Sequence, residues 1–183
     1  MHRLALHLVS LLCLALVACG GGGGSGGIRP ADDAGMSASV ECAPFARALT
    51  GVSLSGPAAD WWRQADGRYA RGPAPEVGSL LVLRRSRRLP SGHVAVVTRV
   101  LSRREIMVTQ ANWVHRRIGE DQPVIDVSRN GDWSAVRVWW PPSGQMGIEA
   151  YQAFGFIRPD RPAGHDQLIA ATPAAVRMAE AGP

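Results

Sequence analysis

Cys42 is the residue of this sequence best suited to nucleophilic chemistry. The chain has three cysteines, of which Cys13 and Cys19 lie in or at the end of an apolar N-terminal run. If that run is an export signal, Cys42 is the one free thiol of the mature chain and has no disulfide partner. Pro44 places it at the start of a predicted helix, where the partial positive charge of the helix N-terminus stabilises a thiolate. A small buried thiol of purely structural role is the alternative.

A cysteine nucleophile needs a base, and the base needs a group that orients its ring. His93 opens a predicted strand, and the next predicted strand ends with Gln110 and Asn112. A two-residue turn at Ser102-Arg103 would pair the strands so that His93 faces Asn112, with Cβ atoms about 4.5–5.5 Å apart. Gln110 would lie on the same face. Each residue alone is more often structural, but the combination predicts a Cys-His site with Asn112 as the preferred orienting group and Gln110 beside it.

The elements that position these residues are predicted between about residues 38 and 158. Ser39 as N-cap, Pro44 in the first turn and Gly51 beyond the end predict a helix over residues 41–49, and a shorter one follows over 56–65. Strands are predicted over residues 79–84, 92–101, 104–112, 123–127, 133–139 and 154–157, with Asn130-Gly131 as a hairpin signal. Helices followed by antiparallel strands predict an α+β fold. The Ala- and Pro-rich residues 159–183 are predicted to be a disordered tail.

The N-terminus carries the features of an export signal. A basic start and a short apolar run predict a signal peptide over residues 1–18. Residues 16–20, with the sequence LVACG, resemble a bacterial lipobox, which implies lipidation of Cys19. A Gly-rich stretch over residues 20–27 predicts a flexible tether within residues 19–37. We therefore expect an exported chain, lipid-anchored to a bacterial membrane and facing the periplasm or cell wall, on the outer membrane in a diderm cell.

Three segments resemble the CHAP family of cysteine, histidine-dependent amidohydrolases/peptidases. They read ECAPFAR at residues 41–47, GHVAVV at 92–97 and QANW at 110–113. The resemblance covers residues 38–158 and implies a papain-like fold of the NlpC/P60-CHAP type, with N-terminal helices packed on an antiparallel sheet. It also implies hydrolysis of peptidoglycan amide bonds, either as an N-acetylmuramoyl-L-alanine amidase or as a peptide endopeptidase. Many members carry Glu where this chain has Gln110, which leaves open whether Gln110 or Asn112 is the third catalytic residue.

Composition and charge narrow the set of partners. The 183 residues are 46% hydrophobic and carry a net charge of +5, which fits one globular domain and argues against a disordered chain. No metal-ligand spacing or phosphate-binding loop occurs in the sequence, so no metal or cofactor is predicted. Peptidoglycan and, through Cys19, a membrane are the expected partners of a monomeric chain, and nucleic acid is not. Residues proposed to contact substrate are Trp113, Arg84, Arg85, Arg87 and Arg88.

Two other functions remain open at the level of sequence. A degenerate domain could bind peptidoglycan without cleaving it, in which case Gln110 would mark the lost activity. A thiol acyltransferase would pass the acyl group to an amine rather than to water. Replacement of Cys42 separates the hydrolase from the binding module, because binding would survive the loss of the thiol and hydrolysis would not.

Overall fold

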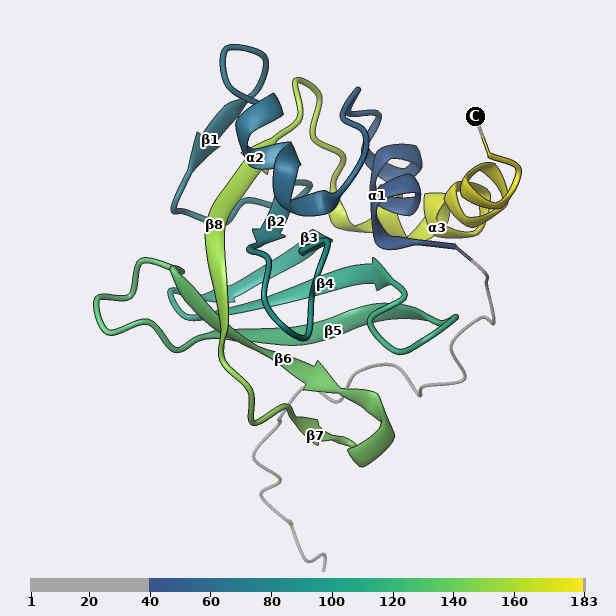
Figure 1. The fold of residues 1–183 in the computed structure, drawn as a ribbon. Coiled ribbons are helices and arrows are strands. Elements are labelled where there is room, and N and C mark those ends of the chain that lie inside the picture. The colour runs from purple at the N-terminus through teal and green to yellow at the C-terminus, as the bar shows by residue number, and fades with distance from the viewer. Residues whose placement is uncertain (1–39, 183) are drawn as a thin grey trace, which may run out of the picture.

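The computed structural model describes residues 40–182 and shows an α+β fold (Figure 1). Short helices come first, antiparallel strands follow, and a longer helix ends the described chain. The helical elements are α1 (Cys42–Thr50), the 3-10 turn η1 (Ala58–Asp60), α2 (Trp61–Gln64), the 3-10 turn η2 (Pro141–Ser143) and α3 (His165–Glu180). The strands are β1 (Ala70–Gly72), β2 (Leu80–Leu83), β3 (His93–Ser102), β4 (Glu105–Ala111), β5 (Ile118–Asp126), β6 (Ala135–Trp140), β7 (Gln145–Met146) and β8 (Tyr151–Arg158).

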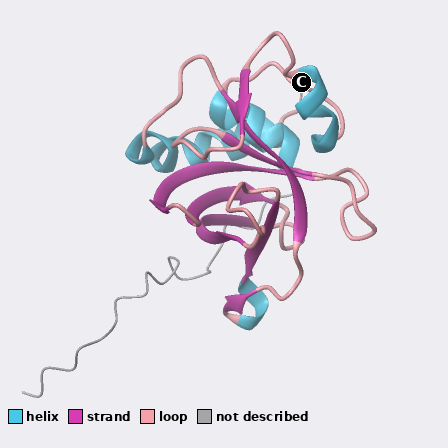
Figure 2. Ribbon diagram, turned by 90° about the vertical axis from the view of Figure 1, so that its left-hand side faces the viewer, coloured by secondary structure: helices cyan, strands magenta, loops and turns pink. Residues whose placement is uncertain are grey.

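The strands form one antiparallel sheet that closes on itself. Its order is β1-β8-β2-β3-β4-β5-β6-β7, and β6 also pairs with β8. Strand β8 therefore bridges β2 and β6 and turns six strands into a barrel-like ring, with α1 and α3 covering the outside of β3 and β4 (Figures 1 and 2). The sequence predicted helices on an antiparallel sheet, which the structure confirms, but it did not predict closure of that sheet.

Side chains of β3 point alternately into two apolar cores, one on each face of the sheet. Val94 and Val96 face the helices and pack with Phe45 and Leu49 of α1. Their neighbours on the other face belong to a second core inside the ring, which is made of Leu81, Leu83, Ala95, Val97, Ile106, Val108, Val124, Trp133, Val136, Val138, Ala153 and Phe156. Because successive side chains of a strand point to opposite faces, a strand between two cores is apolar on both.

The hairpin between β3 and β4 differs in detail from the prediction. Ser102 pairs with Glu105, so the turn is Arg103-Arg104 and not Ser102-Arg103. Two irregularities in the ladder then shift the register, and Val96 lies opposite Thr109, as the predicted pairing requires. The register near the site is therefore as predicted, although the turn that was used to derive it is wrong.

The prediction of a disordered C-terminal tail is wrong. Residues His165–Glu180 form α3, which packs against α1 and buries Leu168, Thr172, Ala175 and Val176. These residues recur at helical spacing, and Thr172 stabilises the turn before Pro173 by donating from Oγ1 to the carbonyl oxygen of Leu168 at 3.0 Å. The folded unit therefore extends beyond residue 158 and includes this helix.

Replacing Leu168 tests the contribution of α3 to stability. Leu168 is 1% exposed within the core shared by α1 and α3. We expect Leu168→Ala to lower the free energy of unfolding by about 2–4 kcal/mol, because the substitution leaves a cavity in that core. Met178→Ala on the same helix is the matched control, since Met178 is 63% exposed. Denaturant unfolding measures both variants, and equal small changes would contradict the packing of α3.

The predicted signal peptide (1–18), lipidated Cys19 and tether (19–37) lie outside the described residues. So does Ser39, the predicted N-cap, and the residue before α1 in the structure is Glu41. Within residues 40–182, no helix is long and apolar enough to cross a membrane.

Candidate active site

Cys42 is the first residue of α1. Glu41 before it is extended, with φ −79° and ψ 156°, and Gly51 ends the helix in the left-handed region at φ 73°. Phe45, Ala46 and Leu49 of the helix are buried and hold α1 against the sheet. Cys42 is partly exposed and forms no disulfide, as a nucleophile requires. The helix start predicted for Cys42 is confirmed.

His93 is the first residue of β3 and lies beside Cys42. Gly92 before it has φ +72°, and a Cβ there would come within 2.6 Å of the Ala59 side chain and 2.7 Å of the Leu83 carbonyl oxygen. Only glycine fits both this conformation and this close approach. Leu83 pairs with His93 across the sheet, so the start of β3 is fixed between β2 and η1. His93 as a whole is 4% exposed.

Cys42 and His93 shift each other's pKa in opposite directions. Burial raises the pKa of the Cys42 thiol, but the charge of His93, a hydrogen bond with its ring and one with the backbone of Val94 outweigh burial and leave that pKa lowered. Burial lowers the pKa of His93, yet the Cys42 thiolate and hydrogen bonds with Cys42 and Gln110 leave it raised. Both shifts favour a thiolate–imidazolium pair, the reactive form of a cysteine nucleophile.

Gln110 of β4, and not Asn112, holds the ring of His93. His93 Nε2 and Gln110 Oε1 are 2.9 Å apart. Because an amide oxygen can only accept, Nε2 must carry a proton, and Nδ1 is the nitrogen left to exchange a proton with Cys42. Gln110 in turn donates from Nε2 to Oε1 of Gln122 at 2.8 Å. This bond fixes which end of the Gln110 amide faces His93.

Asn112 lies outside this chain of hydrogen bonds, so the predicted contact between Asn112 and His93 is not formed in the structure. Strand β4 ends at Ala111, and Asn112 turns the chain with φ 57°, a left-handed conformation that Asn tolerates. Its side chain donates to Glu41 Oε2 at 2.9 Å and accepts from the Arg116 backbone N–H at 2.9 Å. It closes the loop over the N-terminus of α1 instead of holding the imidazole.

Substitution of Gln110 and of Asn112 distinguishes the roles of the two side chains. Gln110→Leu removes a hydrogen bond that raises the pKa of His93, so the imidazolium and with it the thiolate become less stable. We expect alkylation of Cys42 by iodoacetamide near pH 6 to slow about fivefold, the effect of about 1 kcal/mol. Asn112→Ala should leave this rate within about twofold. The reverse order of effects would restore Asn112 as the orienting residue.

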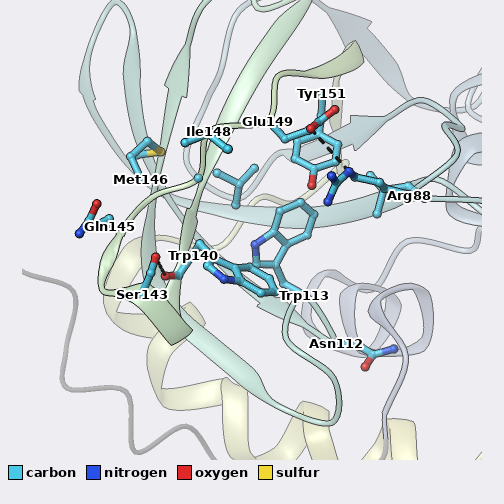
Figure 3. Close-up of a pocket in the computed structure, with 13 residues that line it drawn as sticks. Arg88, Asn112, Trp113, Trp140, Ser143, Gln145, Met146, Ile148, Glu149 and Tyr151 are labelled. Carbon is cyan, nitrogen blue, oxygen red and sulfur yellow. Dashed lines mark hydrogen bonds and ion pairs between the residues drawn. The ribbon is translucent and has the colours of Figure 1, made fainter.

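Trp113 covers the histidine and forms one wall of a cavity. Its ring meets that of His93 edge-on with centroids 5.0 Å apart, and its Nε1 donates to the carbonyl oxygen of Trp139 at 3.0 Å. The cavity has a volume of about 700 Å³ and is lined by Asn112, Trp113, Trp140, Met146 and Tyr151, among others (Figure 3). Trp113 both lines this cavity and contacts His93, whereas Cys42 and His93 themselves do not line it.

The arginines predicted to contact substrate have separate environments. Arg85 forms two 2.9 Å hydrogen bonds with Asp60, and Arg84 lies over the Phe154 ring at 4.4 Å. Both therefore stabilise the fold around η1 and β8. Arg87 is exposed, whereas Arg88 lines the cavity and lies 3.5 Å from Glu149 (Figure 3). Of the residues predicted to contact substrate, Arg88 and Trp113 line the same cavity.

Among residues 40–182, no group of three or more His, Cys, Asp or Glu side chains could hold a metal ion. The polar groups around Cys42 include the imidazole of His93, with the carboxamides of Gln110 and Gln122 behind it, and the carboxylate of Glu41. This set suits proton transfer and covalent catalysis.

A comparison with protein families identifies this arrangement. The model of the CHAP domain matches residues 31–112, from before α1 to the end of β4. Over this segment the chain is similar to the CHAP family. The matched segment includes Cys42, His93, Gln110 and Asn112, whereas β5 to β8 and α3 lie beyond it. No curated protein matches the chain.

Sequence reasoning missed Gln122 and the cavity beyond Trp113. The strand that became β5 was predicted to begin at Pro123, which left Gln122 outside it. Pro123 in fact lies within β5, in a stretch that pairs with β4 alone, because pairing with β6 begins at Val124. Proline has no backbone N–H to donate, and a strand tolerates this where one of its sides is unpaired. Residues 120–122 are all polar, so the sequence does not show which of their side chains faces His93.

Proposed function

We propose that this chain is a peptidoglycan hydrolase that cleaves an amide bond with Cys42 as nucleophile and His93 as general base. CHAP domains are typically cysteine- and histidine-dependent amidohydrolases, and the domain points to peptidoglycan as the substrate. The observation that carries the proposal is the contact between Cys42 and His93, in which each group favours the charged form of the other. A module that only binds its ligand has no use for such a pair.

The proposed reaction is acyl transfer through a thioester. The Cys42 thiolate attacks the scissile carbonyl carbon, and the resulting oxyanion accepts a hydrogen bond from the Cys42 backbone N–H, which has no partner inside α1 because it opens the helix. His93 then donates its proton to the leaving amine as the C–N bond breaks. Water attacks the thioester, His93 takes a proton from it, and the carboxylic acid leaves as the Cys42 thiolate and the His93 imidazolium re-form. The arrangement of a helix N-terminus against a strand that carries the base is papain-like.

The lining of the cavity beside Trp113 suits a polymeric substrate. It is open to solvent past Trp140, which is 41% exposed, and Ile148, which is 93% exposed. An exposed indole offers a face on which a sugar ring can stack, and Arg88 at the rim offers a cation to a carboxylate (Figure 3). Both groups occur in peptidoglycan, so the cavity provides a place for the chain flanking the scissile bond.

Digestion of purified sacculi tests the proposed function and identifies the bond. The purified chain would be incubated with sacculi, and soluble fragments would be analysed by mass spectrometry. Amidase cleavage leaves glycan without peptide, whereas endopeptidase cleavage leaves peptide remnants on the glycan. Transfer to an added amine in place of water would indicate an acyltransferase. Binding to sacculi with no release of fragments would contradict the proposal and favour a binding module.

We further propose that Cys19 is lipidated and anchors the chain to a membrane, because residues 16–20 resemble a lipobox. Cys19→Ser removes the thiol that would carry the lipid. We expect this variant to leave the membrane fraction of expressing cells, whereas Cys13→Ser stays with it. Equal distribution of the two variants on immunoblots of cell fractions would contradict lipidation at Cys19.

A further inference from the structure

We propose that Gln122, placed by a β-bulge beneath Gln110, is a positioning residue for His93. The inference rests on the proposed function, since it assigns a role in setting the reactivity of Cys42. Gln122 lies outside the segment that matches the CHAP model, which ends at residue 112. Its role is therefore argued from the contacts of this chain alone.

Gln122 is the last member of a buried line of hydrogen bonds that begins at His93. His93 Nε2 donates to Gln110 Oε1 at 2.9 Å, and Gln110 Nε2 donates to Gln122 Oε1 at 2.8 Å. Gln110 is 1% exposed and Gln122 is 3% exposed. Water is thus kept from competing for these bonds. Without an acceptor at residue 122, the Gln110 amide loses the contact that distinguishes its oxygen from its nitrogen, and nothing keeps the oxygen on His93.

A bulge in β5 brings Gln122 to the correct face of the sheet. Gln110 pairs with Gly119 and Val108 pairs with Gln122, so two residues of β5 lie opposite Thr109. Residues three apart on a regular strand point to opposite faces, but the extra residue turns Gly119 and Gln122 to the same side, beside Gln110. At Gly119 a Cβ would lie 2.2 Å from the Gln122 carboxamide. The missing side chain of Gly119 is the space that Gln122 occupies.

The outer face of the sheet fixes this bulge. Asp121 has φ 45°, a left-handed conformation that is uncommon for Asp. Its Oδ1 accepts from Thr98 Oγ1 at 2.5 Å, its Oδ2 lies 3.1 Å from an Arg99 nitrogen, and its backbone N–H donates to Thr109 Oγ1 at 3.3 Å. These contacts hold the bulge in place, so the position of Gln122 is set from the side of the sheet opposite His93.

The test measures the rate at which iodoacetamide alkylates Cys42 as a function of pH. The full chain is used, and mass spectrometry of the peptide that contains Cys42 separates this thiol from Cys13 and Cys19. Gln122→Ala removes the acceptor, and we expect alkylation near pH 6 to slow about fivefold. Gln122→Glu keeps an oxygen acceptor whether or not its carboxyl is protonated, so its rate should stay within about twofold of that of the unsubstituted chain.

A double-mutant cycle separates positioning from general damage. Gly119→Ala displaces the Gln122 carboxamide and should slow alkylation, but it should have no further effect when Gln122 is already Ala. A folded Gln122→Ala chain with an unchanged pH profile would overturn the proposal, as would equal slowing by Gln122→Ala and Gln122→Glu. If Gln122→Ala fails to fold in a thermal melt, Gln122→Asn, whose amide is one methylene too short to reach Gln110, replaces it. Alkylation needs no peptidoglycan, so a failure to hydrolyse sacculi would leave this test intact.

Discussion

Cys42→Ala should reduce the release of fragments from peptidoglycan by roughly 10⁴-fold or more, the effect of removing the nucleophile from an acyl-transfer site. Cys42→Ser should be nearly as inactive, because a hydroxyl in contact with His93 does not ionise as the thiol does. Both substitutions are small and fall on a partly exposed residue, so the melting temperature should change little.

The matched measurement for this prediction is binding to sacculi. The cavity beside Trp113 is the proposed place for the substrate chain flanking the scissile bond, and neither substitution changes a residue that lines it. We therefore expect Cys42→Ala to sediment with sacculi as the unsubstituted chain does. Hydrolysis by Cys42→Ala at an undiminished rate would exclude Cys42 as the nucleophile.

Loss of His93 should change both catalysis and the pH dependence of Cys42. In the unsubstituted chain, the charge of His93 and its hydrogen bond with Cys42 lower the pKa of the thiol despite burial. His93→Ala leaves burial as the larger effect, so the pKa of Cys42 should rise. Alkylation at neutral pH should then slow by at least about tenfold, and hydrolysis should fall roughly 10³-fold or more because no group protonates the leaving amine.

The sign of each pKa shift predicts the pH profile of hydrolysis. The acid limb reports formation of the thiolate, and since the pKa of Cys42 is lowered, that limb should lie below the range of an ordinary thiol. The alkaline limb reports loss of the imidazolium, and since the pKa of His93 is raised, that limb should lie above the range of an ordinary histidine. The two limbs belong to the coupled pair. Identical alkylation profiles for His93→Ala and the unsubstituted chain would contradict the pairing.

Local signals in the sequence correctly predicted where Cys42 and His93 lie in the fold. Pro44 and Gly51 mark the ends of α1, and they place Cys42 at its N-terminus in the sequence and in the structure. The apolar run after Gly92 predicted the strand that His93 opens. In both cases the deciding interaction lies within a few residues of the functional side chain, and short-range patterns record such interactions well.

The rest of the site depends on contacts that no local pattern records. Asn112 fits the register for facing His93, but β4 ends one residue earlier and the backbone turns the side chain toward Glu41. The bulge that places Gln122 depends on the contacts of Asp121 with two other strands. Both are tertiary interactions, in which long-range contacts override the alternation expected of a regular strand.

The C-terminal helix shows a different limit of prediction from the sequence. Leu168, Thr172, Ala175 and Val176 have helical spacing, but Pro173 weakens the helix signal. Pro in a helix interior removes a hydrogen bond and normally argues for an end. Burial of one face against α1 outweighs that cost, and this packing partner lies more than a hundred residues earlier in the chain.

Progressive alkylation of Cys42 tests the central claim most directly. Samples of the unsubstituted chain would be treated with iodoacetamide for increasing times, the modified fraction of Cys42 measured by peptide mass spectrometry, and the remaining hydrolysis of sacculi assayed. No substitution is involved, so folding of a variant does not enter the comparison. We predict that hydrolysis falls in proportion to the unmodified fraction of Cys42 and reaches zero when that thiol is fully alkylated. Hydrolysis that persists with Cys42 completely alkylated would contradict the account.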